Sequence, residues 1–153
     1  MSGLPTGSAL ERAMRCAASC ALSRAAHTGE DAIAGTKNHD AIEAGDHTRP
    51  VVGRVLLGAE QERKEVAYAL DVATRTVREL GVSIGRNYGP LSDTEVALTV
   101  DLEQCRLGRW RVVDWKSRER VAGPRDNWQI RAQVLAVMGR HGVDEMDGAL
   151  AYL

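Results

Sequence analysis

Three side chains in the second half of the chain have the types and spacing for metal-assisted chemistry. Asp114 and Lys116 stand two residues apart in the segment VVDWKS, and Asp101 lies in the preceding segment LTVDL. Residues two apart on a β-strand project from the same side of it. If these two segments pair as a hairpin, both carboxylates converge, and they repel each other unless a cation lies between them.

This set predicts metal-assisted hydrolysis of a phosphodiester. Mg²⁺ prefers hard oxygen ligands and keeps bound waters available for reaction. A lysine beside the ion can orient or deprotonate a water, or stabilise charge on a phosphate. An Asp-x-Lys pair alone is commonly a surface ion pair, and that alternative stays open. Val112 and Val113 come directly before Asp114, which indicates a core strand and favours the functional interpretation.

The hydrophobic pattern predicts the strands that must position these residues. We expect strands over residues 64–72, 74–80, 93–102, 109–116 and 149–153, the first two joined as a hairpin at Ala73–Thr74. In the third strand, alternation puts Val96, Leu98, Val100 and Leu102 on one face and Asp101 on the other. In the fourth, it puts Trp110, Val112, Asp114 and Lys116 on one face, with Trp115 in the opposite layer.

Helices are predicted over residues 8–27, 36–44 and 127–141. Asp126 and Gln129 form a plausible capping box for the last of these, and Gly142 a C-cap. Its apolar stripe consists of Ile130, Val134, Val137 and Met138. The order of helix, strands, helix and strand indicates an α/β layer architecture.

Length and charge narrow the class of protein. A chain of 153 residues that is 44% hydrophobic and 27% charged suits one folded domain. With a net charge of −1, the chain as a whole lacks the positive charge that is typical of nucleic-acid-binding proteins. Locally, eight Lys/Arg and three Asp/Glu lie between Arg106 and Arg131, which is either a phosphate-binding patch or a solvated arginine face.

Cysteine usage and hydropathy point to a cytoplasmic protein without a membrane segment. Cys16, Cys20 and Cys105 are odd in number and their spacing fits no zinc pattern, so we expect reduced, buried thiols. Nothing approaches the ~18–20 consecutive apolar residues that a transmembrane helix needs.

Four motifs in order resemble the PD-(D/E)XK nuclease superfamily, most closely its RecB-like, phage-type exonuclease branch. In that family a strand ends in an acid, as at Asp101, and the next ends in DxK, as at Asp114 and Lys116. A following helix carries a Gln motif, here Gln129 in NWQIRAQ, and an upstream GxxxH motif corresponds to GTKNH with His39. The opening segment SALERAMRCAAS is also similar to phage-type members.

The resemblance implies a restriction-endonuclease-like fold, a mixed central sheet flanked by helices. It would be one domain over 1–153, with an N-terminal helical part at 1–50 and a catalytic core at 60–153. The metal, Mg²⁺ or Mn²⁺, would be held by His39, Asp101, Asp114 and the carbonyl of Trp115. Lys116 would act on water, and Gln129 would hold the substrate or the metal shell.

The implied function is a DNA exonuclease in repair or recombination, with a helicase or recombination protein as a possible partner. A catalytically inactive DNA-binding or regulatory domain of the same fold, and a structural interaction domain, are the alternatives. The chain departs from the family where Gln133 replaces the usual Tyr and Leu98 the usual Gly. Other roles also stay open for single residues. Gln129 would cap its helix and His39 would lie on the surface. Glu43 would support the site, and Glu65 or Glu95 would act as an auxiliary acid.

Overall fold

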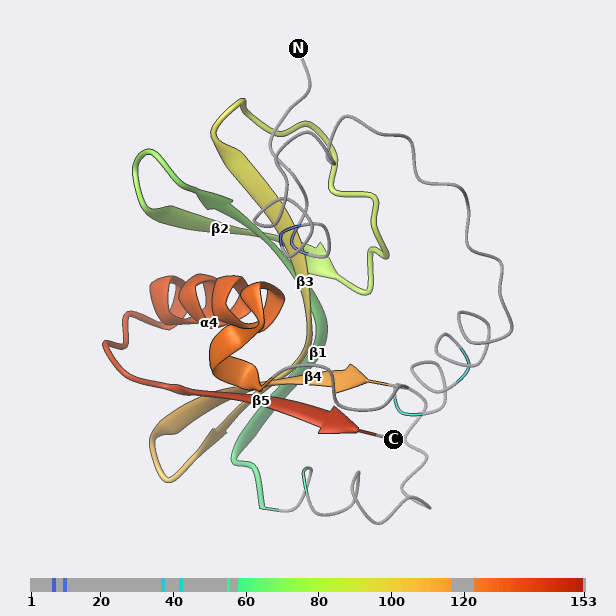
Figure 1. The fold of residues 1–153 in the computed structure, drawn as a ribbon, viewed down its shortest axis with the longest axis vertical. Helices are drawn as coiled ribbons and strands as arrows, with labels where there is room; N and C mark the ends of the chain where they lie inside the picture. Colours follow the sequence, from blue (N-terminus) through green and yellow to red (C-terminus); the bar gives the residue numbers. More distant parts are fainter. Residues whose placement is uncertain are drawn as a thin grey trace.

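Five strands form a single mixed sheet, and one long helix lies across one side of it (Figure 1). The computed structural model describes residues 58–116 and 123–152, together with Gly7, Leu10, Lys37, Ile42 and Val55. The strands are β1 (Gln61–Asp71), β2 (Thr76–Val82), β3 (Glu95–Arg106), β4 (Arg109–Lys116) and β5 (Asp147–Tyr152). A short 3₁₀ helix, η3 (Pro124–Asp126), leads into α4 (Trp128–His141).

The sheet order is β2-β1-β3-β4-β5. Strands β1 to β4 pair antiparallel with their neighbours, whereas β5 runs parallel to β4. Parallel neighbours need a crossover connection, and α4 lies in this one. The expected α/β class is therefore confirmed as a mixed sheet with a helix on one side. The predicted helices at 8–27 and 36–44 lie outside the described residues, apart from the single positions Leu10, Lys37 and Ile42.

The predicted strands are found with small shifts of their ends. The strand predicted at 109–116 has those bounds, but β3 continues to Arg106 instead of ending at residue 102. The reason is the tight turn into β4, where Arg106 pairs directly with Arg109. The two residues between them, Leu107 (φ 52°) and Gly108 (φ 72°), are both left-handed, as a two-residue hairpin turn requires.

The face alternation predicted for β3 is wrong beyond Val100. Val100 packs in the core on the α4 side of the sheet. The side chain of Glu103 lies on the same side, because it contacts Tyr68 of that core. Regular alternation would put these two residues on opposite sides, since they are three positions apart. Leu102 packs in the core on the opposite side of the sheet. The alternation is therefore interrupted between Val100 and Glu103, at Asp101.

The neighbouring strand β1 is irregular at the position opposite Asp101. Glu65 falls between the pairs Lys64↔Leu102 and Val66↔Val100, opposite Asp101, and has a φ of 49°. Counting back two residues from Glu103 puts Asp101 on the α4 side of the sheet. Continuing the β3–β4 register by one pair beyond Leu102↔Val113 puts it opposite Asp114. The irregularity thus turns Asp101 toward the face that carries Asp114.

Two hydrophobic cores flank the sheet. The larger lies between the sheet and α4, and its buried members are Val66, Tyr68, Leu98, Val100, Val112, Ile130, Ala132, Ala136 and Val137. The second lies on the opposite side, where Ile42 and Val55 pack with Leu102, Val113, Trp115 and Ala151. Trp115 is 4% exposed, which confirms its predicted place in the opposite layer.

Two glycines let α4 lie close to the sheet. A Cβ atom at Gly139 of α4 would stand 2.8 Å from Cγ2 of Val77 on β2. One at Gly148 of β5 would stand 2.9 Å from Cγ2 of Val134 on α4. Both separations are shorter than van der Waals contact, so larger side chains there would push the helix away from the strands.

The N-terminus of α4 differs from the predicted capping box. The N-cap is Asn127, whose Oδ1 accepts a hydrogen bond of 3.0 Å from the N–H of Ile130, and Asp126 belongs to η3. Asn and Asp cap equally well, so the sequence did not distinguish them. The capping role considered for Gln129 is wrong, because another residue caps the helix. The predicted C-cap, Gly142, is confirmed with a φ of 64°.

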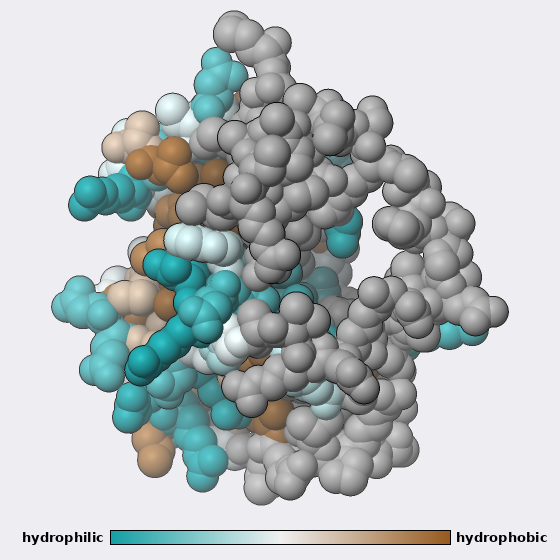
Figure 2. Space-filling view, in the orientation of Figure 1, coloured by the Kyte–Doolittle hydropathy of each residue, from teal (hydrophilic) through white to brown (hydrophobic). Residues whose placement is uncertain are grey.

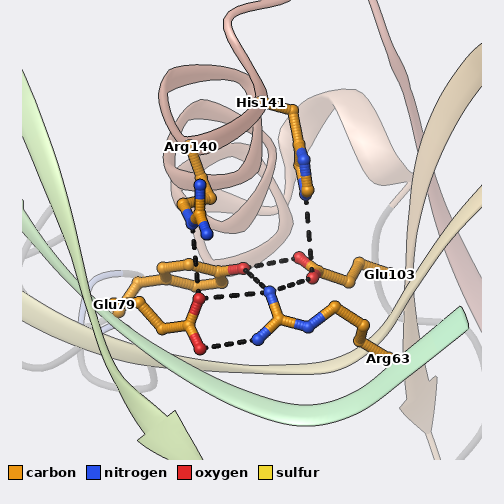
Figure 3. A network of polar contacts seen from close by, with 6 residues as sticks. Arg63, Glu79, Glu103, Arg140 and His141 are labelled. Carbon is orange, nitrogen blue, oxygen red and sulfur yellow. Dashed lines mark hydrogen bonds and ion pairs between the residues drawn. The ribbon is translucent and has the colours of Figure 1, made fainter.

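A polar cluster with a buried centre fixes the C-terminal end of α4 to three strands (Figure 3). At its centre is Glu103, fully buried, which accepts hydrogen bonds from Tyr68 Oη (2.7 Å) and Arg63 Nη1 (3.0 Å). Arg63 also pairs with Glu79 of β2 at 2.6 Å, and Arg140 of α4 donates to the same carboxylate at 3.3 Å. The cluster therefore ties β1, β2, β3 and α4 together.

His141 ends α4 inside this cluster. Its ring stacks on Trp110 of β4, with centroids 3.6 Å apart, and its Nε2 lies 3.7 Å from Glu103 Oε1, too far for a hydrogen bond. Burial lowers the pKa of His141 from its usual value, and this effect outweighs the opposing attraction of Glu103. The folded protein thus holds the imidazole neutral more strongly than the unfolded chain does.

We expect the free energy of unfolding to fall as the pH is lowered from about 7 to about 5. The unfolded chain binds a proton at His141 in this range more readily than the folded protein does, so protonation favours unfolding. A His141→Phe variant keeps a ring to stack on Trp110 and should show a shallower pH dependence. Urea unfolding of both proteins across this range measures the difference. Equal slopes for the two proteins would contradict the assignment.

Candidate active site at the end of strand β4

Asp114 is a buried carboxylate with partners on both oxygens. It is 1% exposed and lies on the face of β4 that α4 covers. Its Oδ1 accepts hydrogen bonds from two amides of α4, Gln129 Nε2 at 2.9 Å and Gln133 Nε2 at 3.3 Å. Its Oδ2 forms an ion pair with the ammonium of Lys116. Burying this charge is tolerable only because these donors replace water.

Lys116 closes a ring of polar contacts with Asp114 and Gln129. Its Nζ pairs with Asp114 Oδ2 and donates to Gln129 Oε1 at 3.2 Å, while the amide nitrogen of Gln129 faces Asp114 Oδ1. The two contacts fix the orientation of the Gln129 amide, because its nitrogen must face the carboxylate and its oxygen the ammonium. The Lys116 side chain is 29% exposed, so the ring opens to solvent at the ammonium.

Asp101 joins the site from the neighbouring strand. Its Oδ2 accepts a hydrogen bond of 2.8 Å from the backbone N–H of Trp115. This bond holds the carboxylate against the β4 backbone, between Asp114 and Lys116. The predicted convergence of Asp101, Asp114, Lys116 and Gln129 is therefore found in the fold, together with the backbone of Trp115.

Gln133 also belongs to this site, although the sequence analysis noted it only as a departure from the family pattern. It is fully buried and donates to Asp114 Oδ1 and to the carbonyl of Thr99, the latter at 2.8 Å. The signal that pointed to it was spacing. A residue four positions after Gln129 lies on the same face of a helix, and that face meets Asp114.

Other predicted residues lie elsewhere or outside the described residues. His39 lies outside them. Glu95 is at the far end of β3, roughly 20 Å along the strand from Asp101. Hydrogen bonding to Arg78, at 2.6 Å, holds the pKa of Glu95 at about 2, and the backbone N–H of Ser92 adds to this effect. An ion pair with Arg78 thus accounts for Glu95, and its auxiliary-acid role is not supported.

The donors present suit Mg²⁺ or Mn²⁺. Asp101 and Asp114 supply carboxylate oxygens and Trp115 a backbone carbonyl, all hard ligands that such ions prefer. Within 58–116 and 123–152 no three His, Cys, Asp or Glu side chains come together as a metal-binding group. The expected set, however, takes its third side chain from His39, outside these ranges. The two described carboxylates fit the implied ion as part of a site.

The part of the predicted basic patch that the structure describes, residues 106–116 and 123–131, is divided between two places. Near the β3–β4 turn, Arg109 pairs with Glu145 (3.6 Å) and Arg111 donates to Gln104 (2.8 Å), so these cations are already engaged. In the first turn of α4, Arg131 is exposed and its guanidinium stands 4.1 Å over the ring of Trp128. Over the described atoms seen in Figure 2, hydrophilic and hydrophobic side chains are interspersed.

Comparisons with known proteins found no relative of this chain. No protein-family model matches it, and neither the curated proteins nor the solved structures contain a match. Within the described parts of the chain, no helix combines the length and apolar character needed to cross a membrane. The function must therefore be argued from the geometry of the site and from the motif resemblance.

Breaking the Asp114–Lys116 pair should have unequal effects on stability. Lys116→Met leaves a buried carboxylate without its cation, and we expect a loss of about 1–3 kcal/mol in the free energy of unfolding. That figure is below the cost for a fully buried pair, because solvent partly screens Lys116. Asp114→Asn should cost less than about 1 kcal/mol, since its oxygen keeps the glutamine donors and Lys116 can turn to water. Urea unfolding at pH 7 measures both, and equal losses would contradict this account.

Proposed function

We propose that this chain is a metal-dependent deoxyribonuclease that hydrolyses DNA phosphodiester bonds, and that it acts as an exonuclease. The observation that carries the proposal is the closed ring of Asp114, Gln129 and Lys116, with Asp101 beside it on the adjacent strand. These are the residues that the PD-(D/E)XK motifs select, and they meet at one end of β4 although they come from three elements.

The topology around the ring supports the same family. An acid lies on β3, the DxK pair ends β4, and the glutamine lies on the helix that leads to β5. That order is the one the resemblance implies for a restriction-endonuclease-like fold. We therefore propose this fold for the domain, with its flanking helices completed by the N-terminal part, from which Ile42 packs on the second face of the sheet.

Each polar group of the site has a chemical task in this proposal. Lys116, held at one end of the ring and open to solvent, donates to a phosphate oxygen or orients an attacking water. Gln129 keeps the ammonium and the carboxylate in fixed relation, and the N–H of Trp115 holds Asp101 in place. A bound Mg²⁺ ion would supply Lewis-acid stabilisation of charge on the phosphate and a lowered pKa for a bound water.

The surroundings favour a nucleic-acid substrate. Arg131 stacks over Trp128 at the N-terminal end of α4, the end that also carries Gln129, and provides an exposed cation there. A guanidinium on an aromatic ring can contact phosphate and also stack with a base. From the resemblance, we propose a cytoplasmic enzyme of DNA repair or recombination that works with a helicase or recombination partner.

Cleavage of linear, circular and single-stranded DNA, with and without Mg²⁺ and a chelator, tests the proposal. Activity on linear DNA should appear with Mg²⁺ or Mn²⁺ and vanish with the chelator. Asp114→Asn should lower the rate by about 100-fold or more, because it removes charge from the metal-binding oxygens. The matched control is Asp144→Asn, the same substitution at an exposed position in the loop after α4.

Three outcomes would decide against a nuclease. Equal cleavage by wild type and Asp114→Asn would point to a contaminating activity. DNA binding that weakens with salt but is indifferent to metal, with no cleavage, would favour the inactive DNA-binding domain. No binding and no cleavage would favour an interaction domain.

A further inference from the structure

Gln133 is a buried polar side chain that contacts Asp114 and has no task in the proposed chemistry. It is fully buried on the side of α4 that faces the sheet, among apolar residues of the larger core. Its Nε2 donates to two acceptors, the carbonyl of Thr99 at 2.8 Å and Asp114 Oδ1 at 3.3 Å. Because both neighbours are acceptors, the amide nitrogen must face them, which fixes the orientation of the group.

The carbonyl oxygen of Gln133 then points away from these partners. It is buried and has no hydrogen-bond partner among the described residues. An unsatisfied amide oxygen is unfavourable in a core, where a methionine or leucine of similar size carries no such cost. A role in packing alone therefore does not explain a glutamine at this position. Its hydrogen bonds to the carbonyl of Thr99 and to Asp114 do, and the second of these bears on the site.

The contact limits how Asp114 can bind other groups. Gln129 and Gln133 both donate to Oδ1, and a carboxylate oxygen has two lone pairs in the plane for such donors. Oδ2 receives no hydrogen bond in the described structure apart from its ion pair with Lys116. Only Oδ2 is thus left to meet a cation, once the partly exposed Lys116 gives way or shares this oxygen.

We propose that Gln129 and Gln133 form an amide clamp that confines Asp114 to one-oxygen coordination and so makes the site select Mg²⁺ over Ca²⁺. Mg²⁺ requires near-octahedral coordination by single oxygens, whereas the larger Ca²⁺ takes six to eight ligands and readily accepts both oxygens of one carboxylate. Gln133 is a positioning residue, since it acts through Asp114. The inference rests on the proposed metal site and adds the basis of its ion selectivity.

Gln133→Met tests the clamp at the cleaner of its two positions. Methionine has a similar length and no donor, and Gln133 does not contact Lys116, whereas Gln129 contacts both charged groups. The matched control is Gln104→Met. Gln104 is also buried, but its amide bonds Glu62 and Arg111, away from the site.

Isothermal titration of the full chain with MgCl₂ and with CaCl₂ measures the ratio of the two affinities without relying on catalysis. Gln133→Met removes one of the two amide donors from Asp114 Oδ1 and should lower the ratio of Mg²⁺ affinity to Ca²⁺ affinity by about tenfold. Gln104→Met should keep the wild-type ratio. If Gln133→Met does not fold, as judged by circular dichroism, Gln129→Met at the partly exposed position decides, with a change in the same direction expected.

The outcomes separate this inference from the proposed function. A wild-type chain that binds neither ion with a Kd below about 10 mM would overturn the metal site and the clamp together. A wild-type chain that binds Mg²⁺, with an unchanged ratio in the folded clamp variants, would overturn the clamp alone. A ratio that shifts equally in Gln104→Met would also overturn it, because the effect would then not be specific to Asp114.

Discussion

The burial of one negative charge constrains the rest of this structure. Asp114 is 1% exposed, and a carboxylate removed from water requires a cation and hydrogen-bond donors in its place. The chain supplies the cation two residues along the same strand and the donors from a helix that follows β4 in sequence. The position of α4 over the end of β4 is thus tied to the ionisation of a single side chain.

The helix can meet that requirement because it is fixed along its whole length. Gly148 and Gly139 permit a close approach to β5 and β2, and the Glu103 cluster secures the C-terminal end. The amides near the N-terminal end then have little freedom to move away from Asp114. A packed core transmits such positioning because its elements cannot shift independently of one another.

The sequence was sufficient to predict the parts of the site that depend on local pattern. Strand 109–116, the shared face of Asp114 and Lys116, and the opposite placement of Trp115 all follow from a period of two. The presence of a helix over residues 128–141 follows from its apolar stripe and its C-cap. The motif order added Gln129, which periodicity alone would have left as a cap.

The remainder depends on contacts that a single strand does not encode. The interruption at Asp101 is matched by the left-handed backbone of Glu65 on the neighbouring strand, so it belongs to the pair of strands. A simple alternation would have placed Asp101 on the wrong face. The role of Gln133 likewise depends on the depth to which α4 packs, because a shallower helix would leave the same amide in solvent.

The two polar clusters at the ends of α4 differ in a way that bears on function. Glu103 is fully buried and is bound by Tyr68, which is also fully buried, and by Arg63, which is held in turn by Glu79. Asp114 has one oxygen whose partner, Lys116, reaches solvent and can exchange it for water or a ligand. A site that binds a new group needs an atom that can change partners at low cost, because a buried polar atom left without a partner is unfavourable. The same helix therefore carries a polar network centred on a fully buried carboxylate at one end and a network that opens to solvent through Lys116 at the other.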